Sequence, residues 1–274
     1  MAKSLTDNST SLSMRRALLV IVFLAPFLGF LLIRVNLVAA LAPIFLSHVF
    51  LLYATLTPNC QWFGPVYRSF ATSEPEVWLT IDDGPSPVHT VALLDILDRF
   101  QARATFFLIG TQAEKYPHLV TEILARGHDI ANHTYTHPVG SFWFATPGRI
   151  GAEIDSCTEW LRTAPDRRAR LFRAPVGLKN MFVHPELDRR GLSLIGWSVR
   201  GLDTIRRDPA KVAERIIRLI KPGAIVVLHE GQRAEKHPEF NPRCVELTLT
   251  GLAERGYRCV IPRPEQLRSR AAGK

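Results

Sequence analysis

The chain has 274 residues, is 47% hydrophobic and 22% charged, and carries a formal net charge of +9. This composition excludes a disordered chain and allows one large domain with an appendage. The basic residues do not alternate with aromatic residues as in a nucleic-acid-binding face, so a solvated surface or an anionic membrane explains the charge better. The four cysteines lack Cys-x-x-Cys spacing and predict no disulfide framework.

Residues 1–16 form a polar N-terminal tail, and two apolar runs follow it over residues 17–56. Only the short segment Arg34-Val35-Asn36 separates the two runs. About 20 apolar residues cross a bilayer as a helix, so we predict one or two N-terminal transmembrane helices. A cleaved signal peptide is the alternative, but the apolar sequence continues well past a cleavage site. The side on which the remaining chain lies depends on whether one run or both runs span the membrane.

Residues 57–75 contain turn formers and aromatic residues, which predicts a juxtamembrane linker. Strand-like and helix-like segments then alternate over residues 76–264, and a basic tail follows at 265–274. About seven strands alternating with helices predict an α/β fold, either a barrel or a wound parallel sheet. In both architectures the functional side chains gather at the carboxyl ends of the strands.

Titratable side chains follow several of these predicted strands. The apolar run Val77–Ile81 ends in two adjacent carboxylates, Asp82 and Asp83. Two carboxylates this close resist joint ionisation, and a metal on one with a basic partner for the other would favour the charged forms. On this stretch alone, a surface turn with solvated carboxylates is an equal alternative. The other predicted strand ends carry His133, Arg173, Trp197 followed by Asp203, and His229.

His133 and His137 are four residues apart, which places both rings on one face of a predicted helical turn. One carboxylate from a neighbouring strand end completes a three-ligand site of the open kind that catalytic metals use. A second carboxylate is then free to take a proton from water, with Arg173 as its basic partner. Together with His229 as an acid, this set suits hydrolysis of an amide or an ester.

The soluble part resembles the polysaccharide deacetylases of the NodB-homology type, carbohydrate esterase family four, over about residues 75–264. The resemblance implies a distorted (β/α) barrel of seven or eight strands. It rests on Thr80-Ile-Asp-Asp-Gly-Pro85, His133-Thr-Tyr-Thr-His137, Arg173-Ala-Pro-Val-Gly177, Asp203, and Ile225-Val-Val-Leu-His229.

The resemblance also implies roles for the individual residues. Asp82 is expected as the general base and His229 as the general acid. Arg173 is expected to orient the base, and Asp203 to orient the acid. Zinc is the expected metal, although cobalt, manganese and nickel suit the same ligand types. The implied metal ligands are Asp83, His133 and His137.

The substrate pocket is expected to include Val176, Trp197 and Val227, with the backbone N–H of Val176 helping to hold the oxyanion. The chain departs from the family at three positions that line this groove. Val176 replaces an aromatic residue, Thr204 replaces a tryptophan, and Val227 replaces a leucine. The aromatic loop 142–144 has three interpretations: stacking on a sugar, contact with the membrane interface, or ordinary packing.

We therefore expect a membrane-anchored, metal-dependent hydrolase in a bacterial plasma membrane that removes N-acetyl groups from amino sugars of a polysaccharide or glycan. One alternative is a deformylase or deacylase of a lipid-linked amino sugar at the membrane surface. An alternative of another class is an inactive glycan-binding or membrane scaffold protein, against which the complete catalytic set argues. The expected partners are the glycan or lipid-linked sugar and membrane lipid, with no nucleic acid.

Overall fold

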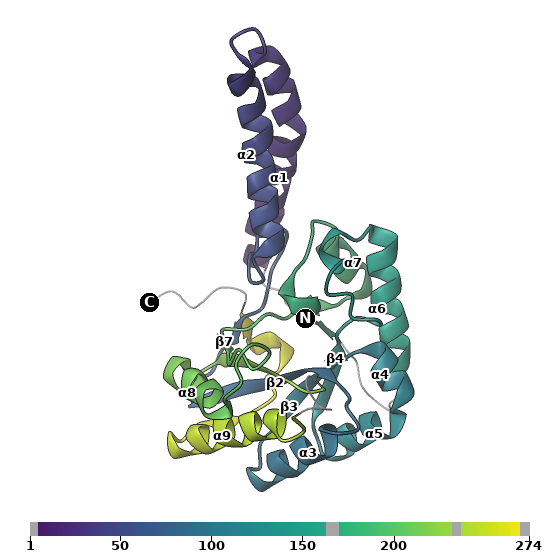
Figure 1. The fold of residues 1–274 in the computed structure, drawn as a ribbon, viewed down its shortest axis with the longest axis vertical. Coiled ribbons are helices and arrows are strands. Elements are labelled where there is room, and N and C mark those ends of the chain that lie inside the picture. The colour runs from purple at the N-terminus through teal and green to yellow at the C-terminus, as the bar shows by residue number, and fades with distance from the viewer. Residues whose placement is uncertain (1–4, 163–169, 232–236, 269–274) are drawn as a thin grey trace.

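The computed structural model describes residues 5–162, 170–231 and 237–268. A curled sheet with helices around it forms the body of the molecule, and a helical hairpin projects from one end (Figure 1). The outermost parts of the two predicted tails, residues 1–4 and 269–274, lie outside the described residues.

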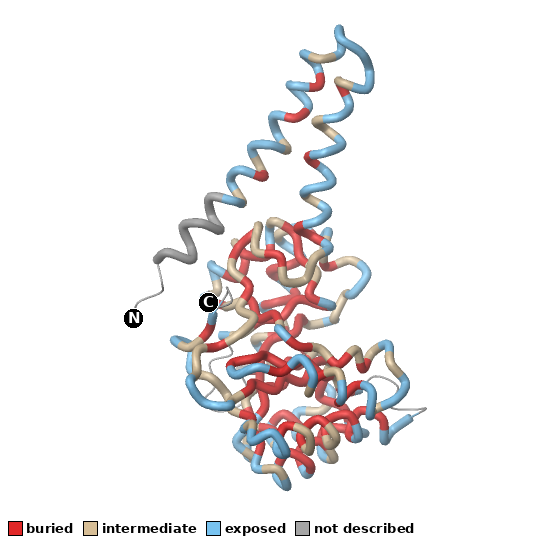
Figure 2. The backbone as a smooth tube through the Cα atoms, turned by 90° about the vertical axis from the view of Figure 1, so that its left-hand side faces the viewer, coloured by how far each residue is buried: buried red, intermediate tan, exposed pale blue. Residues whose placement is uncertain are grey.

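The hairpin consists of α1 (Leu5–Leu32) and α2 (Leu37–Leu56). The chain reverses between them, where the side chain of Asn36 accepts a hydrogen bond from the N–H of Ala39 at 2.8 Å and so caps α2. Met14–Leu32 and Leu37–Leu56 are long and apolar enough to cross a membrane. Figure 2 shows that most of the hairpin is exposed, unlike a helix in a soluble core. Both predicted spans are therefore present as candidate transmembrane helices.

The sheet confirms the predicted distorted barrel. Its strands run in the order β10-β1-β8-β2-β3-β4-β5-β6, with β7 also paired to β8 and β9 to β2. A bridge between Tyr67 and Ile195 joins the segment before β1 to the segment after β6, so the curled sheet meets itself there. The bounds are β1 (Ser69–Phe70), β2 (Glu76–Gly84), β3 (Ala104–Leu108), β4 (Asp129–Asn132), β5 (Leu171–Phe172), β6 (Ser193–Leu194), β7 (Val199–Arg200), β8 (Ala224–His229), β9 (Arg258–Cys259) and β10 (Leu267–Arg268).

The pairs around β2 are parallel, and the strands in the middle of the sheet are almost wholly buried. Helices cover the outside, and their apolar faces pack on the sheet; in α8, for example, Val212 and Ile216 are fully buried. The bounds are α3 (Thr90–Arg99), α4 (Gly110–Lys115), α5 (Pro117–Ala125), α6 (Pro147–Arg162), α7 (Val183–Arg190), α8 (Pro209–Leu219) and α9 (Phe240–Glu254), with short 3-10 helices at Phe142–Phe144, Pro175–Gly177 and Pro264–Gln266.

Two segments differ from the sequence expectation. The predicted strand whose end carries Trp197 is instead two short strands, β6 and β7, separated by a loop that contains Trp197. The segment 57–75, predicted as a linker, contributes β1, which pairs with both β8 and β10. These three strands, β1, β6 and β7, have only two residues each, which is too short for a clear alternating pattern.

Candidate metal and catalytic site

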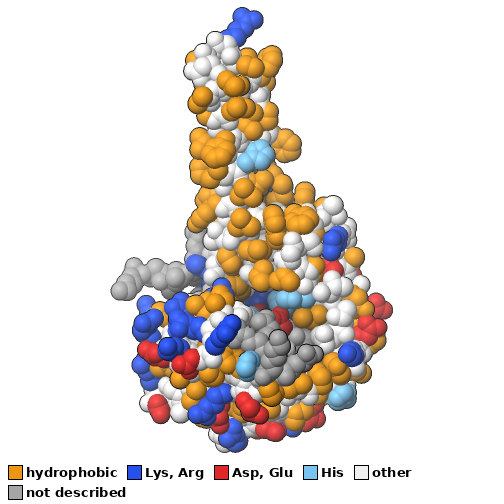
Figure 3. All heavy atoms as spheres, viewed as in Figure 1, with side chains coloured by type: hydrophobic (Ala, Val, Ile, Leu, Met, Phe, Trp, Pro, Cys, Tyr) orange, Lys and Arg blue, Asp and Glu red, His pale blue; other side chains and the backbone are white. Residues whose placement is uncertain are grey.

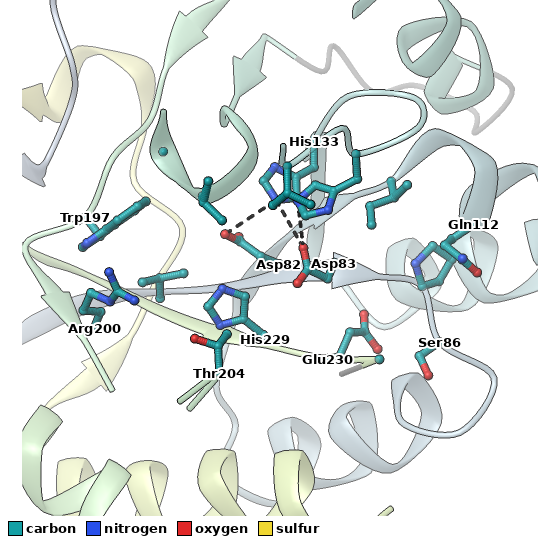
Figure 4. Close-up of a pocket in the computed structure, with 18 of the residues that line it drawn as sticks. Asp82, Asp83, Ser86, Gln112, His133, Trp197, Arg200, Thr204, His229 and Glu230 are labelled. Carbon is teal, nitrogen blue, oxygen red and sulfur yellow. Dashed lines mark ion pairs between the residues drawn. The ribbon is translucent and has the colours of Figure 1, made fainter. Parts of the chain in front are cut away.

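The two adjacent carboxylates both reach the site because β2 is irregular at its end. Consecutive strand residues normally point to opposite faces. Here Asp82 pairs with Phe107 and Gly84 pairs with Leu108, which leaves Asp83 as an extra residue in a bulge with a φ of 73°. A bulge re-aims side chains locally, and so both carboxylates lie side by side in the same pocket (Figure 4).

Asp83, His133 and His137 form a compact group whose ligand atoms all lie within 4.8 Å of one another. Oδ1 of Asp83 is 3.4 Å from Nε2 of His133 and 3.3 Å from Nε2 of His137. The Nδ1 of His133 donates to the carbonyl oxygen of Arg173 at 2.9 Å, so its Nε2 presents a lone pair to the site. The Nε2 of His137 is buried without a hydrogen bond in the described part of the chain. These donors fit a divalent metal.

The charge states of this group also suit a metal. Burial raises the pKa of Asp83, but the hydrogen bond and positive charge of His133 outweigh burial and hold that pKa well below its usual range. Burial, followed by the charge of His133, lowers the pKa of His137 to about 4. An ionised carboxylate at Asp83 and a neutral imidazole at His137 are the forms that bind a metal.

The predicted helical turn over 133–137 is wrong. The segment is a loop in which Thr134 and His137 have φ values of 68° and 52°. The loop still brings the two imidazole ring centres to 4.7 Å. Glu153 of α6 holds it, because this carboxylate accepts hydrogen bonds from the N–H groups of Tyr135 and Thr136 at 3.0 and 2.8 Å. The sequence did not lead us to predict a role for Glu153. Its position next to Ile154, which faces inward from α6, could have indicated that this carboxylate is buried.

Arg173 is fully buried, and its guanidinium donates to Oδ1 of Asp82 at 2.6 Å. It also donates to the hydroxyl of Thr80 at 2.8 Å and to the carbonyl oxygen of Gly196 at 3.0 Å, and it lies 4.0 Å from the ring centre of Phe107. A buried guanidinium with this many partners has little freedom to move. Arg173 therefore fixes the orientation of the Asp82 carboxylate.

His229 stands beside Asp82 because the two residues are paired across β8 and β2. Its Nδ1 lies 3.1 Å from Oδ1 of Asp203, and its backbone N–H donates to Oδ2 of the same residue at 2.8 Å. Burial lowers the pKa of His229, but the charge and hydrogen bond of Asp203, followed by the charges of Asp82 and Asp83, raise it to about 9. The imidazole is therefore a proton donor at neutral pH.

A cavity of about 770 Å³ contains these groups. The predicted pocket residues Val176, Trp197 and Val227 all line it. Val176 is 49% exposed with a φ of 48°, an uncommon conformation for a β-branched residue that is typical of functional sites. Figure 4 shows Trp197 on one side of the carboxylates and Gln112 on the opposite side.

The sequence analysis missed two further charged residues of the pocket, Arg200 and Glu230. Burial raises the pKa of Glu230 to about 8, although a hydrogen bond from the hydroxyl of Thr90 at 2.6 Å opposes the shift. Glu230 directly follows His229 at the end of a predicted strand, and this position could have indicated that its side chain lines the pocket. For Arg200 the only signal was its position between Trp197 and Asp203, which both lie at a predicted strand end.

The chain is similar in sequence to several known proteins. A family model described as polysaccharide deacetylase matches residues 70–195. A chitooligosaccharide deacetylase from Bradyrhizobium sp. is 35% identical over 188 residues, which are 68% of this chain and 83% of that protein. A peptidoglycan-N-acetylglucosamine deacetylase from Bacillus cereus is 29% identical over 72% of this chain and 91% of its own length.

A solved structure shares the fold of the body. The family 4 carbohydrate esterase from Streptomyces lividans, in complex with acetate, has a TM-score of 0.63 and 26% identity, and the match covers 72% of this chain and 97% of that one. Matches of this extent in sequence and in fold point to one family and one class of reaction. The chain belongs to the polysaccharide deacetylases of carbohydrate esterase family 4 and is a hydrolase.

Proposed function

We propose that the chain is a metal-dependent deacetylase that removes N-acetyl groups from the amino sugars of a glycan. The observation that carries this proposal is the three-ligand group Asp83, His133 and His137, with two proton-transfer pairs beside it. Those pairs are Asp82 with Arg173 and His229 with Asp203. The names of the relatives from Bradyrhizobium and Bacillus cereus support an N-acetylated amino sugar as the substrate.

The proposed reaction adds water to the acyl carbon and breaks the bond from that carbon to nitrogen. Asp83, His133 and His137 would hold a divalent ion, which when bound would supply Lewis acidity for this reaction. Asp82 takes a proton from the water, with its carboxylate held in place by Arg173. The backbone N–H of Val176 helps to hold the negative oxygen. His229 gives its proton to the departing nitrogen, so the products are acetate and an amino sugar.

The metal site is tested by replacing one proposed ligand, His137→Gln, with His118→Gln as the matched control. His118 is an exposed residue of α5 that does not line the cavity. We expect zinc affinity, measured by calorimetry on the detergent-solubilised chain, to fall more than about 100-fold in His137→Gln, since second-shell changes alone cost 10–100-fold. Acetate release from N-acetylglucosamine oligomers should fall with it. Unchanged zinc affinity in His137→Gln would exclude this ligand set.

We further propose that the hairpin anchors the enzyme in the membrane with the pocket close to the bilayer. Lys179, buried three residues beyond Val176, donates its ammonium hydrogens to the carbonyl oxygens of Thr57 and Pro58 at 3.2 and 2.6 Å. Asn59 donates to the carbonyl oxygen of Trp197 at 2.8 Å. Residues immediately after α2 therefore contact two walls of the pocket. This contact favours a lipid-linked N-acyl amino sugar as the second candidate substrate.

If both helices span, the N-terminus and the catalytic domain lie on the same side. Arg15 and Arg16 precede the apolar part of α1, and positive residues of this kind remain in the cytoplasm. We therefore assign the domain to the cytoplasmic face of the membrane. A substrate there is a glycan precursor rather than a finished extracellular polymer.

The anchor is tested by placing a charge in each helix, with Phe23→Lys and Phe45→Lys combined. These rings are 78% and 68% exposed, so lysines there do not disturb a protein core. Each lysine near a helix centre costs about 2.5–3.5 kcal/mol of insertion free energy. We expect the double variant to move from the membrane to the carbonate-soluble fraction, while Leu219→Lys, at the end of α8, stays in the membrane. A membrane-bound double variant would contradict the proposal.

A further inference from the structure

Arg200 places a cation at one side of the pocket. It is the last residue of β7, and it pairs with Val227 of β8. Residues paired across a sheet share a face, and side chains two apart on a strand also share a face. Arg200, Val227 and His229 are therefore directed to the same side of the sheet, and all three line the cavity.

The guanidinium of Arg200 has no carboxylate within ion-pair distance in the described part of the chain. Its contact is aromatic, because it lies 5.8 Å from the ring centre of Trp197. Arg173 in the same site is instead bonded to Asp82, and Arg190 on the surface is bonded to Asp155. Arg200 is thus a cation in the pocket wall, and no carboxylate of the described residues neutralises its charge.

Positive and negative side chains lie on different sides of the pocket around Arg200 and Glu230. Figure 4 shows Arg200 beside Trp197 on one side, whereas Asp83 and Glu230 lie toward the other. Thr204, which stands where the family usually has a tryptophan, lines the cavity on the side of Arg200. A threonine is much smaller than an indole and leaves room for a substituent of the sugar. Figure 3 shows Lys and Arg side chains gathered over β7 and α8, which attracts anions toward this side of the pocket.

We propose that Arg200 binds an anionic group, a phosphate or a carboxylate, on the sugar that carries the acyl group. A guanidinium binds either group through two parallel hydrogen bonds. The aromatic face of Trp197 holds the guanidinium in place without neutralising it. This inference rests on the proposed function and narrows its substrate class from neutral amino sugars to anionic ones.

The test compares Arg200→Gln with Arg207→Gln, which removes the same charge from an exposed position in the segment between β7 and α8. Each protein is assayed with three sugars: the methyl glycoside of N-acetylglucosamine, N-acetylglucosamine 1-phosphate, and N-acetylmuramic acid. We expect Arg200→Gln to raise the KM of one anionic sugar at least about tenfold with little change in kcat, since a charge-assisted hydrogen bond made equally in the ground state and the transition state affects KM alone. The neutral glycoside should be unaffected, and so should all three sugars with Arg207→Gln.

The anionic sugar that loses affinity identifies the source of the charge, a phosphate or the carboxylate of a muramic-type sugar. An equal loss for neutral and anionic sugars, or no loss for either, would overturn the assignment of Arg200. Calorimetric binding of the same sugars requires no turnover. If the wild type releases no acetate but binds the anionic sugar through Arg200, the proposed function fails and this inference stands.

Discussion

Asp82→Asn should lower kcat by about 10²–10⁴, the range that a positioned general base contributes. Asparagine keeps the shape of the side chain and still accepts a hydrogen bond from Arg173, but it takes up no proton from water. The proposed metal ligands do not include this residue, so bound zinc should stay at the wild-type level. Acetate release and metal content, measured on the same purified protein, separate the two properties.

Folding is the main competing explanation, because the substitution leaves the charge of Arg173 buried without a counter-ion. Removing one partner of a buried pair costs about 3–5 kcal/mol. Thermal unfolding of Asp82→Asn should therefore accompany the assay. The matched control is Glu76→Gln, which removes a carboxylate from the same strand. The Glu76 carboxylate forms an ion pair at 3.0 Å with the exposed guanidinium of Arg258. A folded, zinc-loaded Asp82→Asn protein with normal kcat would show that Asp82 is not the base.

The sequence predicts which residues meet in the site better than it predicts how they meet. The carboxyl ends of parallel strands form one edge, so Asp82, Arg173 and His229 follow from the order of strands alone. The bulge at Asp83 does not, because it depends on pairing with β3, which is far from it in sequence. The loop at His137 also depends on a distant residue, Glu153.

The short elements were hardest to predict, and they shape the substrate end of the pocket. β7 has two residues, and its place beside β8 depends on register with Val226 and Val227 rather than on an apolar run. The contact of Lys179 with the carbonyl groups after α2 joins segments about 120 residues apart. Local patterns contain no information about either contact. For this reason the catalytic chemistry was predicted in more detail than the substrate or the position of the pocket relative to the membrane.

Asp203→Asn should move the basic limb of the pH profile of kcat to lower pH. The charge and hydrogen bond of Asp203 are the largest influences that raise the pKa of His229, to about 9. A general acid must carry its proton before the step, so kcat falls as the pH rises through this pKa. Without the carboxylate the proton is lost earlier, by about one to two pH units, since such a hydrogen bond contributes about 1.5–3 kcal/mol and one unit equals 1.36 kcal/mol.

The control is Asp208→Asn, which removes the same charge five residues later. Asp208 is exposed and caps α8 through a hydrogen bond from the N–H of Ala210 at 2.9 Å. A bound divalent ion lowers the pKa of His229 in all three proteins, so the difference between their profiles is the measured quantity. If the basic limb of the pH profile shifts equally in both variants, the shift results only from the loss of a distant negative charge. A limb that moves in Asp203→Asn alone assigns the proton to His229, because no other imidazole in the described chain contacts Asp203.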